Sequence, residues 1–133
     1  MSDAPQHNDF CIAIGADFRR TLTLTNSDGI LFDFTSPDPW SAKMDIRTGK
    51  SQDSDLIVSL TTANGRITMG SDGSITLSLT ASLTSTDQNI LDNAGKTGHF
   101  DLFIFPPATS TDQTRRLLFG KIKILEAVTD VSV

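Results

Sequence analysis

The chain has 133 residues, of which 38% are hydrophobic, and this size and composition suit one domain with one hydrophobic core. Its 16 Asp and Glu outnumber its 11 Lys and Arg, and the net charge of -5 disfavours nucleic acid and anionic membrane surfaces as partners. Cys11 is the only cysteine, so no intrachain disulfide can form, and no apolar run is long enough to span a membrane.

Period-two alternation of apolar residues predicts strands along the first part of the chain. Residues 1–9 are mostly polar and indicate a flexible N-terminal tail, which leaves residues 10–133 as a single domain. Three short strands are expected, over 10–14, 18–25 and 30–34. A turn signal at 26–29 separates the second strand from the third, and Pro37 and Pro39 end the third.

The middle of the chain has the clearest strand patterns. Trp40, Ala42, Met44 and Ile46 alternate with polar residues, which predicts a strand with one buried and one wet face. After a polar loop over 48–54, residues 55–80 spell three more strands. Two short turns join these strands, at Asn64-Gly65 and Asp72-Gly73, because such dipeptides accept positive φ. This pattern predicts two consecutive hairpins, with Leu56, Val58, Leu60 and Leu77 among the buried side chains.

The last third adds one helical turn and two strands. Ser85, with Gln88 three residues later, predicts a capped helical turn, and it is the only helix expected. The strand over 99–105 has apolar residues on both faces, which is typical of a central or doubly covered strand. Pro106 and Pro107 end it, and a final strand follows in which Gly120 marks a bulge or a close approach.

Together these elements predict an all-β fold: an antiparallel immunoglobulin-like β-sandwich of about eight or nine short strands with one short helical turn. The stripes place Trp40, Met44, Leu77 and Phe100 in the core.

No residue pattern indicates catalysis. His7 and His99 lack other ligands at metal-binding spacing, and nothing in the sequence beside Cys11 marks it as a catalytic nucleophile. Gly70 to Gly73 joins two strands, so it is a turn and not a phosphate-binding loop. We therefore expect no enzyme activity, no catalytic residue, no metal site and no cofactor.

The candidate contact residues lie on the terminal strands and beside the prolines. Residues 10–14 and 118–125 are apolar and carry no proline, so each could add to a neighbouring subunit, or both could complete the sandwich of their own chain. A basic pair beside the last strand suits an acidic partner surface. The partner-binding candidates are Phe10, Ile12, Pro106, Pro107, Arg115 and Arg116, with the loops 106–116 and 48–54 as further candidates.

The order of motifs also resembles a known group of proteins. The segments GADFRRTLTLTNSDG, ILFDFTSPDPWSAKMDIR, LTTANGRITMGSDGSITLSLTASLT, GHFDLFIFP and RRLLFGKIKILEAVT follow one another over residues 12–129. This layout is similar to the immunoglobulin-like N-terminal domain of the upper baseplate proteins of tailed bacteriophages. Asp33 to Thr35, Met44 to Arg47 and Asn64 to Gly73 match the family's motifs. Its usual Tyr-Asp-Leu appears here as Phe100-Asp101-Leu102, which loses a hydroxyl and keeps the aromatic ring.

The resemblance implies a non-enzymatic virion structural protein, made and folded in the host cytoplasm. Its expected role is that of an adaptor or attachment module of the tail, baseplate, neck or fibre-anchoring region. Other virion proteins are its expected partners, and the chain is expected in a symmetric homo-oligomeric ring or in multiple copies. A capsid decoration protein and a receptor- or glycan-binding module are the alternatives.

Overall fold

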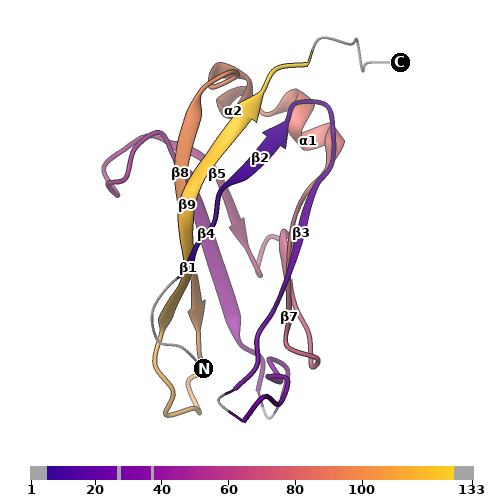
Figure 1. Ribbon diagram of the computed structural model, residues 1–133, viewed down its shortest axis with the longest axis vertical. Helices are drawn as coiled ribbons and strands as arrows, with labels where there is room; N and C mark the ends of the chain where they lie inside the picture. The colour runs from indigo at the N-terminus through magenta and orange to yellow at the C-terminus, as the bar shows by residue number, and fades with distance from the viewer. Residues whose placement is uncertain (1–5, 27, 37, 128–133) are drawn as a thin grey trace.

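The computed structural model describes residues 6–26, 28–36 and 38–127, and its strands form two facing β-sheets (Figure 1). In the six-stranded sheet the order is β1-β9-β8-β4-β5, with β2 also paired to β9; the three-stranded sheet has the order β3-β7-β6. The strands are β1 (Gln6–His7), β2 (Phe10–Ala13), β3 (Phe18–Thr23), β4 (Ser41–Arg47), β5 (Leu56–Thr61), β6 (Ile67–Met69), β7 (Ser74–Leu79), β8 (Thr97–Phe105) and β9 (Arg115–Leu125).

This strand order is that of an immunoglobulin-like sandwich. The consecutive neighbours β9, β8, β4 and β5 correspond to strands G, F, C and C′, while β3, β7 and β6 correspond to B, E and D. The chain has no tyrosine and a single cysteine, so it lacks both the tyrosine corner and the inter-sheet disulfide of antibody domains. The predicted immunoglobulin-like β-sandwich is therefore confirmed, and its two sheets pack together through apolar side chains without an intrachain disulfide.

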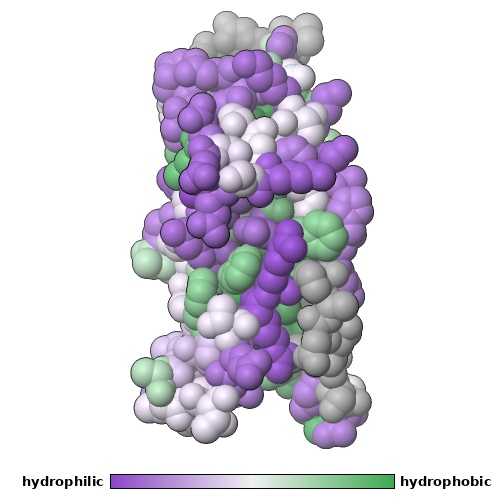
Figure 2. All heavy atoms as spheres, turned by 90° about the vertical axis from the view of Figure 1, so that its left-hand side faces the viewer, coloured by the Kyte–Doolittle hydropathy of each residue, from purple (hydrophilic) through white to green (hydrophobic). Residues whose placement is uncertain are grey.

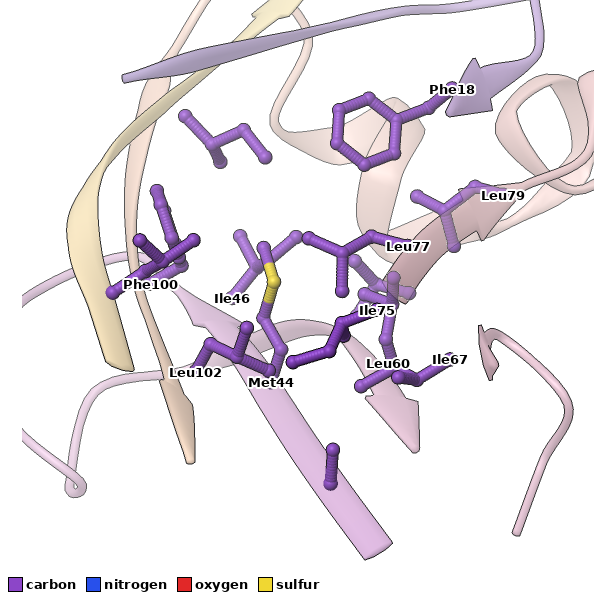
Figure 3. Packing of buried hydrophobic residues seen from close by; sticks show 14 of the residues in the cluster. Phe18, Met44, Ile46, Leu60, Ile67, Ile75, Leu77, Leu79, Phe100 and Leu102 are labelled. Atoms are coloured by element: carbon purple, nitrogen blue, oxygen red, sulfur yellow. The ribbon is translucent and has the colours of Figure 1, made fainter. Parts of the chain in front are cut away.

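One hydrophobic core fills the space between the sheets. Figure 3 shows side chains of β4 and β8 pointing toward side chains of β7 from the opposite sheet. All four residues predicted for the core are buried: Met44 and Leu77 are 0% exposed, Phe100 is 4% exposed and Trp40 is 8% exposed. The period-two stripes thus identified the two faces that meet.

The two turns of the middle segment differ in kind. Gly73, with a φ of 77°, closes the predicted hairpin between β6 and β7. Gly65, with a φ of 79°, lies between β5 and β6, which belong to different sheets. The prediction of two consecutive hairpins is therefore wrong: the first turn carries the chain across the sandwich. Asn64 stabilises this crossing, because its side chain accepts the backbone N–H groups of Thr61 and Arg66 at 3.0 and 3.1 Å.

A bulge changes the side chains that β5 buries. The pairing register shifts where Ile46 and Arg47 of β4 face β5, so that Ile57 has no direct partner there. Ile57 and Val58 are consequently both buried, while Leu56 is 41% exposed. The predicted burial of Leu56 is wrong for this reason.

The segment over 30–34 was expected to be a strand and forms only one isolated bridge, between Thr25 and Leu31. The Asn26 side chain closes the turn before this segment, because it accepts the N–H groups of Asp28 and Ile30 at 3.0 and 3.1 Å. The pairing does not continue, because the N–H groups of Leu24 and Phe34 donate to the carbonyls of Gly73 and Gly70, at 2.8 and 3.2 Å. Phe34 then packs against Trp40, with ring centroids 6.0 Å apart.

Two short helices, α1 (Ala81–Thr86) and α2 (Gln88–Asp92), replace the single expected turn. Their caps are Thr80 and Asp87, whose side chains accept backbone N–H groups, and Ser85 lies inside α1 instead of capping it. The buried Thr84 hydroxyl donates to the carbonyl of Ala16 at 3.0 Å and so attaches α1 to the turn between β2 and β3. No helix in the described ranges has the length and apolar character needed to cross a membrane.

The N-terminal strands depart from the all-antiparallel expectation, because β1 and β2 both run parallel to β9. Residues 6–7 form β1, so this part of the predicted tail is a strand, and residues 1–5 lie outside the described part of the chain. Gly120 permits the parallel pairing: a Cβ on Gly120 would lie against the carbonyl oxygen of Asn8. The predicted close approach at Gly120 is confirmed. The bulge in β9 lies three residues earlier, at Leu117.

Substitutions at two neighbouring residues of β7 should lower the stability of the fold by very different amounts, because one side chain is buried and the other points outward. Leu77→Ala should lower the free energy of unfolding by about 2–5 kcal/mol, because it leaves a cavity beneath a fully buried side chain. Thr76→Ala should cost less than about 1 kcal/mol, since its hydroxyl meets only that of Thr21, 3.2 Å away on the exposed face. Urea unfolding of both variants measures the difference, and equal losses would contradict this strand register.

Gly120→Ala tests the close approach between β9 and the N-terminal strands. The added methyl group must displace the Asn8 carbonyl, so we expect a loss of about 1–3 kcal/mol, the usual cost of overpacking. Amide hydrogen exchange should show faster exchange at Asn8, whose N–H donates to Phe119, and unchanged exchange at Ser78 in the other sheet. Unchanged protection at Asn8 would contradict the assigned contact.

Candidate functional site

The outer face of the six-stranded sheet carries an open groove with a volume of about 610 Å³. Its residues come from β1, β4, β8 and β9 and from the 48–54 loop. Figure 2 views the molecule from the side on which β8 and this loop lie in Figure 1, and it shows hydrophobic residues lying among strongly hydrophilic ones. No other element of the described chain covers this face, which makes the groove the candidate functional site.

Aromatic rings form the apolar part of the groove. Phe103 and Phe105 extend outward from β8, half-buried, with stacked rings whose centroids are 6.4 Å apart. Phe119 of β9 faces the ring of His7 at 5.3 Å. Of the two expectations for β8, that it is central or that it is covered on both faces, the first is confirmed, because β8 lies between β9 and β4. Core residues cover one of its faces, and the other face lines the groove.

The groove is cationic although the chain is acidic. Five Lys and Arg and two Asp line it, a formal charge of +3 in a chain of net charge -5, so the remaining residues carry -8. The cations are Lys43, Arg47, Lys50, Arg116 and Lys121. A face of this sign attracts acidic groups of a partner, while its rings supply apolar contact area.

Two of these cations have partners inside the groove. Arg47 Nη2 lies 3.2 Å from Asp45, and Asp45 also accepts the Ser59 hydroxyl at 2.7 Å. Arg116 lies 3.7 Å from the carboxylate of Asp101 and stacks over the ring of Phe119, 4.6 Å from its centroid. These contacts hold both guanidinium groups against the sheet and leave their outer surfaces open to a ligand.

Asp9 fixes one edge of the groove. Its Oδ1 accepts the backbone N–H of Lys121 at 2.9 Å and lies 3.1 Å from His7 Nε2. The Lys121 N–H is the main reason that the pKa of Asp9 is held below its ordinary value of 3.8, and the neighbouring His7 acts in the same direction. Asp9 therefore joins the segment between β1 and β2 to β9.

The candidate contact residues from the sequence lie in different surroundings. Arg116 lies in the groove, and Pro106 and Pro107 follow β8 at the end of the sandwich, half-buried. Phe10 is half-buried and stacks on Phe100 with centroids 5.2 Å apart. Ile12 is 0% exposed and belongs to the core, so the prediction that it contacts a partner is wrong. Arg115 is half-buried in β9, where it pairs with β8.

The terminal strands pair with each other, because β2 lies along β9 over four residue pairs. Of the two alternatives left open by the sequence, the one in which both strands complete their own sandwich is confirmed. Sequence reasoning missed Lys43, Arg47 and Phe119 as site residues. The signal available was the pair Phe103 and Phe105, two large apolar residues on the outward face of a strand.

The described ranges contain no group of three or more His, Cys, Asp or Glu that could hold a metal ion. Cys11 is exposed on β2, outside the set of residues that line the groove. The arrangement is suited to binding by charge and by aromatic contact.

No protein-family model matches the chain, and no curated protein matches it. Among solved structures, the extracellular domains of the voltage-gated sodium channel β4 subunit, described as parallel homodimers with a role in cell-cell adhesion, align with a TM-score of 0.41. The identity is 13%, over 96% of this chain and 98% of that one. A structure from work on multimeric cell-adhesive interactions of these β subunits aligns with a TM-score of 0.42 and 14% identity, over 97% and 98% of the two chains.

The lowered pKa of Asp9 predicts a pH dependence. A carboxylate with a depressed folded pKa contributes stability above its unfolded value of 3.8, and this contribution is lost as pH falls through the folded value. Wild type should therefore be more stable than Asp9→Asn at pH 7, and the difference should vanish in the acid range below 3.8. Urea midpoints of both proteins across this range provide the test, and a pH-independent difference would contradict it.

Proposed function

We propose that this protein is a non-enzymatic attachment module of a tailed-bacteriophage virion, and that it binds its partner through the groove on the six-stranded sheet. The observation that carries this proposal is the groove itself: an open cationic surface with half-buried aromatic rings on an otherwise acidic domain. Such a mixture is typical of protein contact surfaces, in which aromatic residues and Arg are enriched.

The motif order over residues 12–129 supports the virion assignment. The matched segments fall on particular elements of the sandwich: Met44 to Arg47 lies on β4, and Phe100-Asp101-Leu102 lies on β8. Both strands contribute side chains to the groove. In this assignment the immunoglobulin-like fold is the scaffold, and the partner is a component of the tail, baseplate, neck or fibre-anchoring region of the virion.

Arg116→Glu tests this function. In the particle-producing host, tagged wild-type chain should sediment with purified particles through a density gradient. The amount of Arg116→Glu that sediments with particles should be at least about tenfold lower. The substitution removes a cation from the groove and places a second negative charge beside Asp101, which repels an acidic partner. Lys123→Glu makes the same charge change on exposed β9 outside the groove, and it should behave as wild type. Particles free of the wild-type chain, or equal incorporation of all three, would contradict the proposal.

Glycan binding is a second candidate, and the half-exposed rings of Phe103, Phe105 and Phe119 favour it. Trp40 is in the core, as predicted, but these three rings still give the groove apolar faces that a sugar ring can stack on. A glycan array with wild type and Phe103→Ala decides between the two: selective binding that the variant loses supports a receptor-binding module.

A further inference from the structure

We propose that the groove of one copy receives the turn between β3 and β4 of a second copy, so that the chain assembles head to tail. This inference rests on the proposed function and names the partner of the same groove. The turn is defined here as residues 28–33, Asp28-Gly29-Ile30-Leu31-Phe32-Asp33. It lies with the other loops at the lower end of the sandwich in Figure 1.

The turn carries the two most exposed large apolar side chains of the described chain. Ile30 is 62% exposed and Leu31 is 49% exposed, whereas most other large apolar residues are buried or half-buried. Two adjacent branched side chains at a protruding turn, exposed to this degree, form a compact apolar anchor. The aromatic rings in the groove offer such an anchor a surface of the same polarity.

Backbone hydrogen bonds hold this anchor in place before any contact forms. The N–H of Asn26 donates to the carbonyl of Ile30 at 2.9 Å, and the N–H of Phe32 donates to the carbonyl of Leu24 at 3.0 Å. The Asn26 side chain closes the turn from within. Binding therefore orders little additional backbone, which lowers the entropic cost of association.

The charges of the two surfaces are complementary. Asp28 and Asp33 flank the apolar pair, and no Lys or Arg occurs between Arg20 and Lys43. In the groove, Arg47 and Arg116 have carboxylate partners and Lys121 lies in the field of Asp9. Lys43 and Lys50 have no ion-pair partner among the described residues, so they are the cations left to meet the carboxylates of the turn.

The two surfaces lie on different parts of the molecule, so a contact between them is heterologous. One copy uses its groove and the next uses its turn, and each bound copy still has one free surface of each kind. Such a contact produces a ring where the rotation between copies closes and an open filament where it does not.

Two variants with opposite defects test the contact. Lys43→Glu with Lys50→Glu disables the groove, and Ile30→Ser with Leu31→Ser disables the turn. All four side chains are exposed, so both variants should fold, and circular dichroism and thermal melting verify this. The matched controls are Lys96→Glu with Lys123→Glu for charge, and Leu56→Ser for an exposed leucine elsewhere.

Analytical ultracentrifugation at low salt gives the readout. Wild type and controls should form species larger than a dimer, and each disabled variant should weaken association by at least about tenfold. An equimolar mixture of the two variants should form a 1:1 dimer and nothing larger, because it contains one intact groove and one intact turn. Raising the salt should weaken every association that depends on the lysines.

Several results would overturn the contact: wild type that stays monomeric to about 1 mM, wild type that stops at a dimer, or a mixture that does not dimerise. A second outcome is a monomeric wild type and a variant without residues 1–5 that associates. That result would mean that the N-terminal segment of the same chain occupies the groove, and it would reject the contact between copies. The particle assay separates the two proposals. Incorporation that depends on Arg116 in a monomeric protein would retain the attachment function and reject the head-to-tail contact.

Discussion

The packing of the two sheets against each other depends on the apolar side chains that meet between them. Cys11 is the only cysteine and lies exposed on β2, so the chain cannot form the inter-sheet disulfide that antibody domains have. Met44, Leu60, Ile75 and Leu77 are each 0% exposed between the layers and supply the attraction that holds the layers together. Because this attraction is the sum of many small contacts, a cavity left by one truncated core side chain weakens it. The outward residues of the same strands do not contribute to the core and can contact a partner.

The outer face of β8 shows how one strand serves both purposes. Phe100, Leu102 and Ile104 point inward and are buried, while His99, Asp101 and Phe103 point outward into the groove. The bulge at Leu117 of β9 lies opposite the step from Leu102 to Phe103, and it lets Arg116 pair with Phe103 while the inward residues of β8 keep their places. Core and groove are thus two sides of one sheet, and a register slip in β8 would damage both.

Alternation in the sequence predicted the buried stripes of β4, β7 and β8 because each strand has one face on the core. It did not predict the partner of each strand. Asn64-Gly65 has the residues of a hairpin turn, yet a crossing between sheets requires the same positive φ at Gly65. The parallel β2–β9 pairing and the groove both bring together residues more than a hundred positions apart. The alternation of neighbouring residues does not predict which distant segments will pair.

The parallel pairing also sets how this domain would respond to mechanical force. β1 starts beside Leu118, and β9 continues from there to Leu125, so the described ends of the chain leave at opposite ends of the sandwich. A pull on these ends loads the bonds from Asn8 to Phe119, from Lys121 to Asp9 and from Ile14 to Leu125 in shear, all at once instead of one after another. Rupture then requires several bonds to fail together, which raises the barrier to forced unfolding. A domain held in this way can bear tension along its long axis.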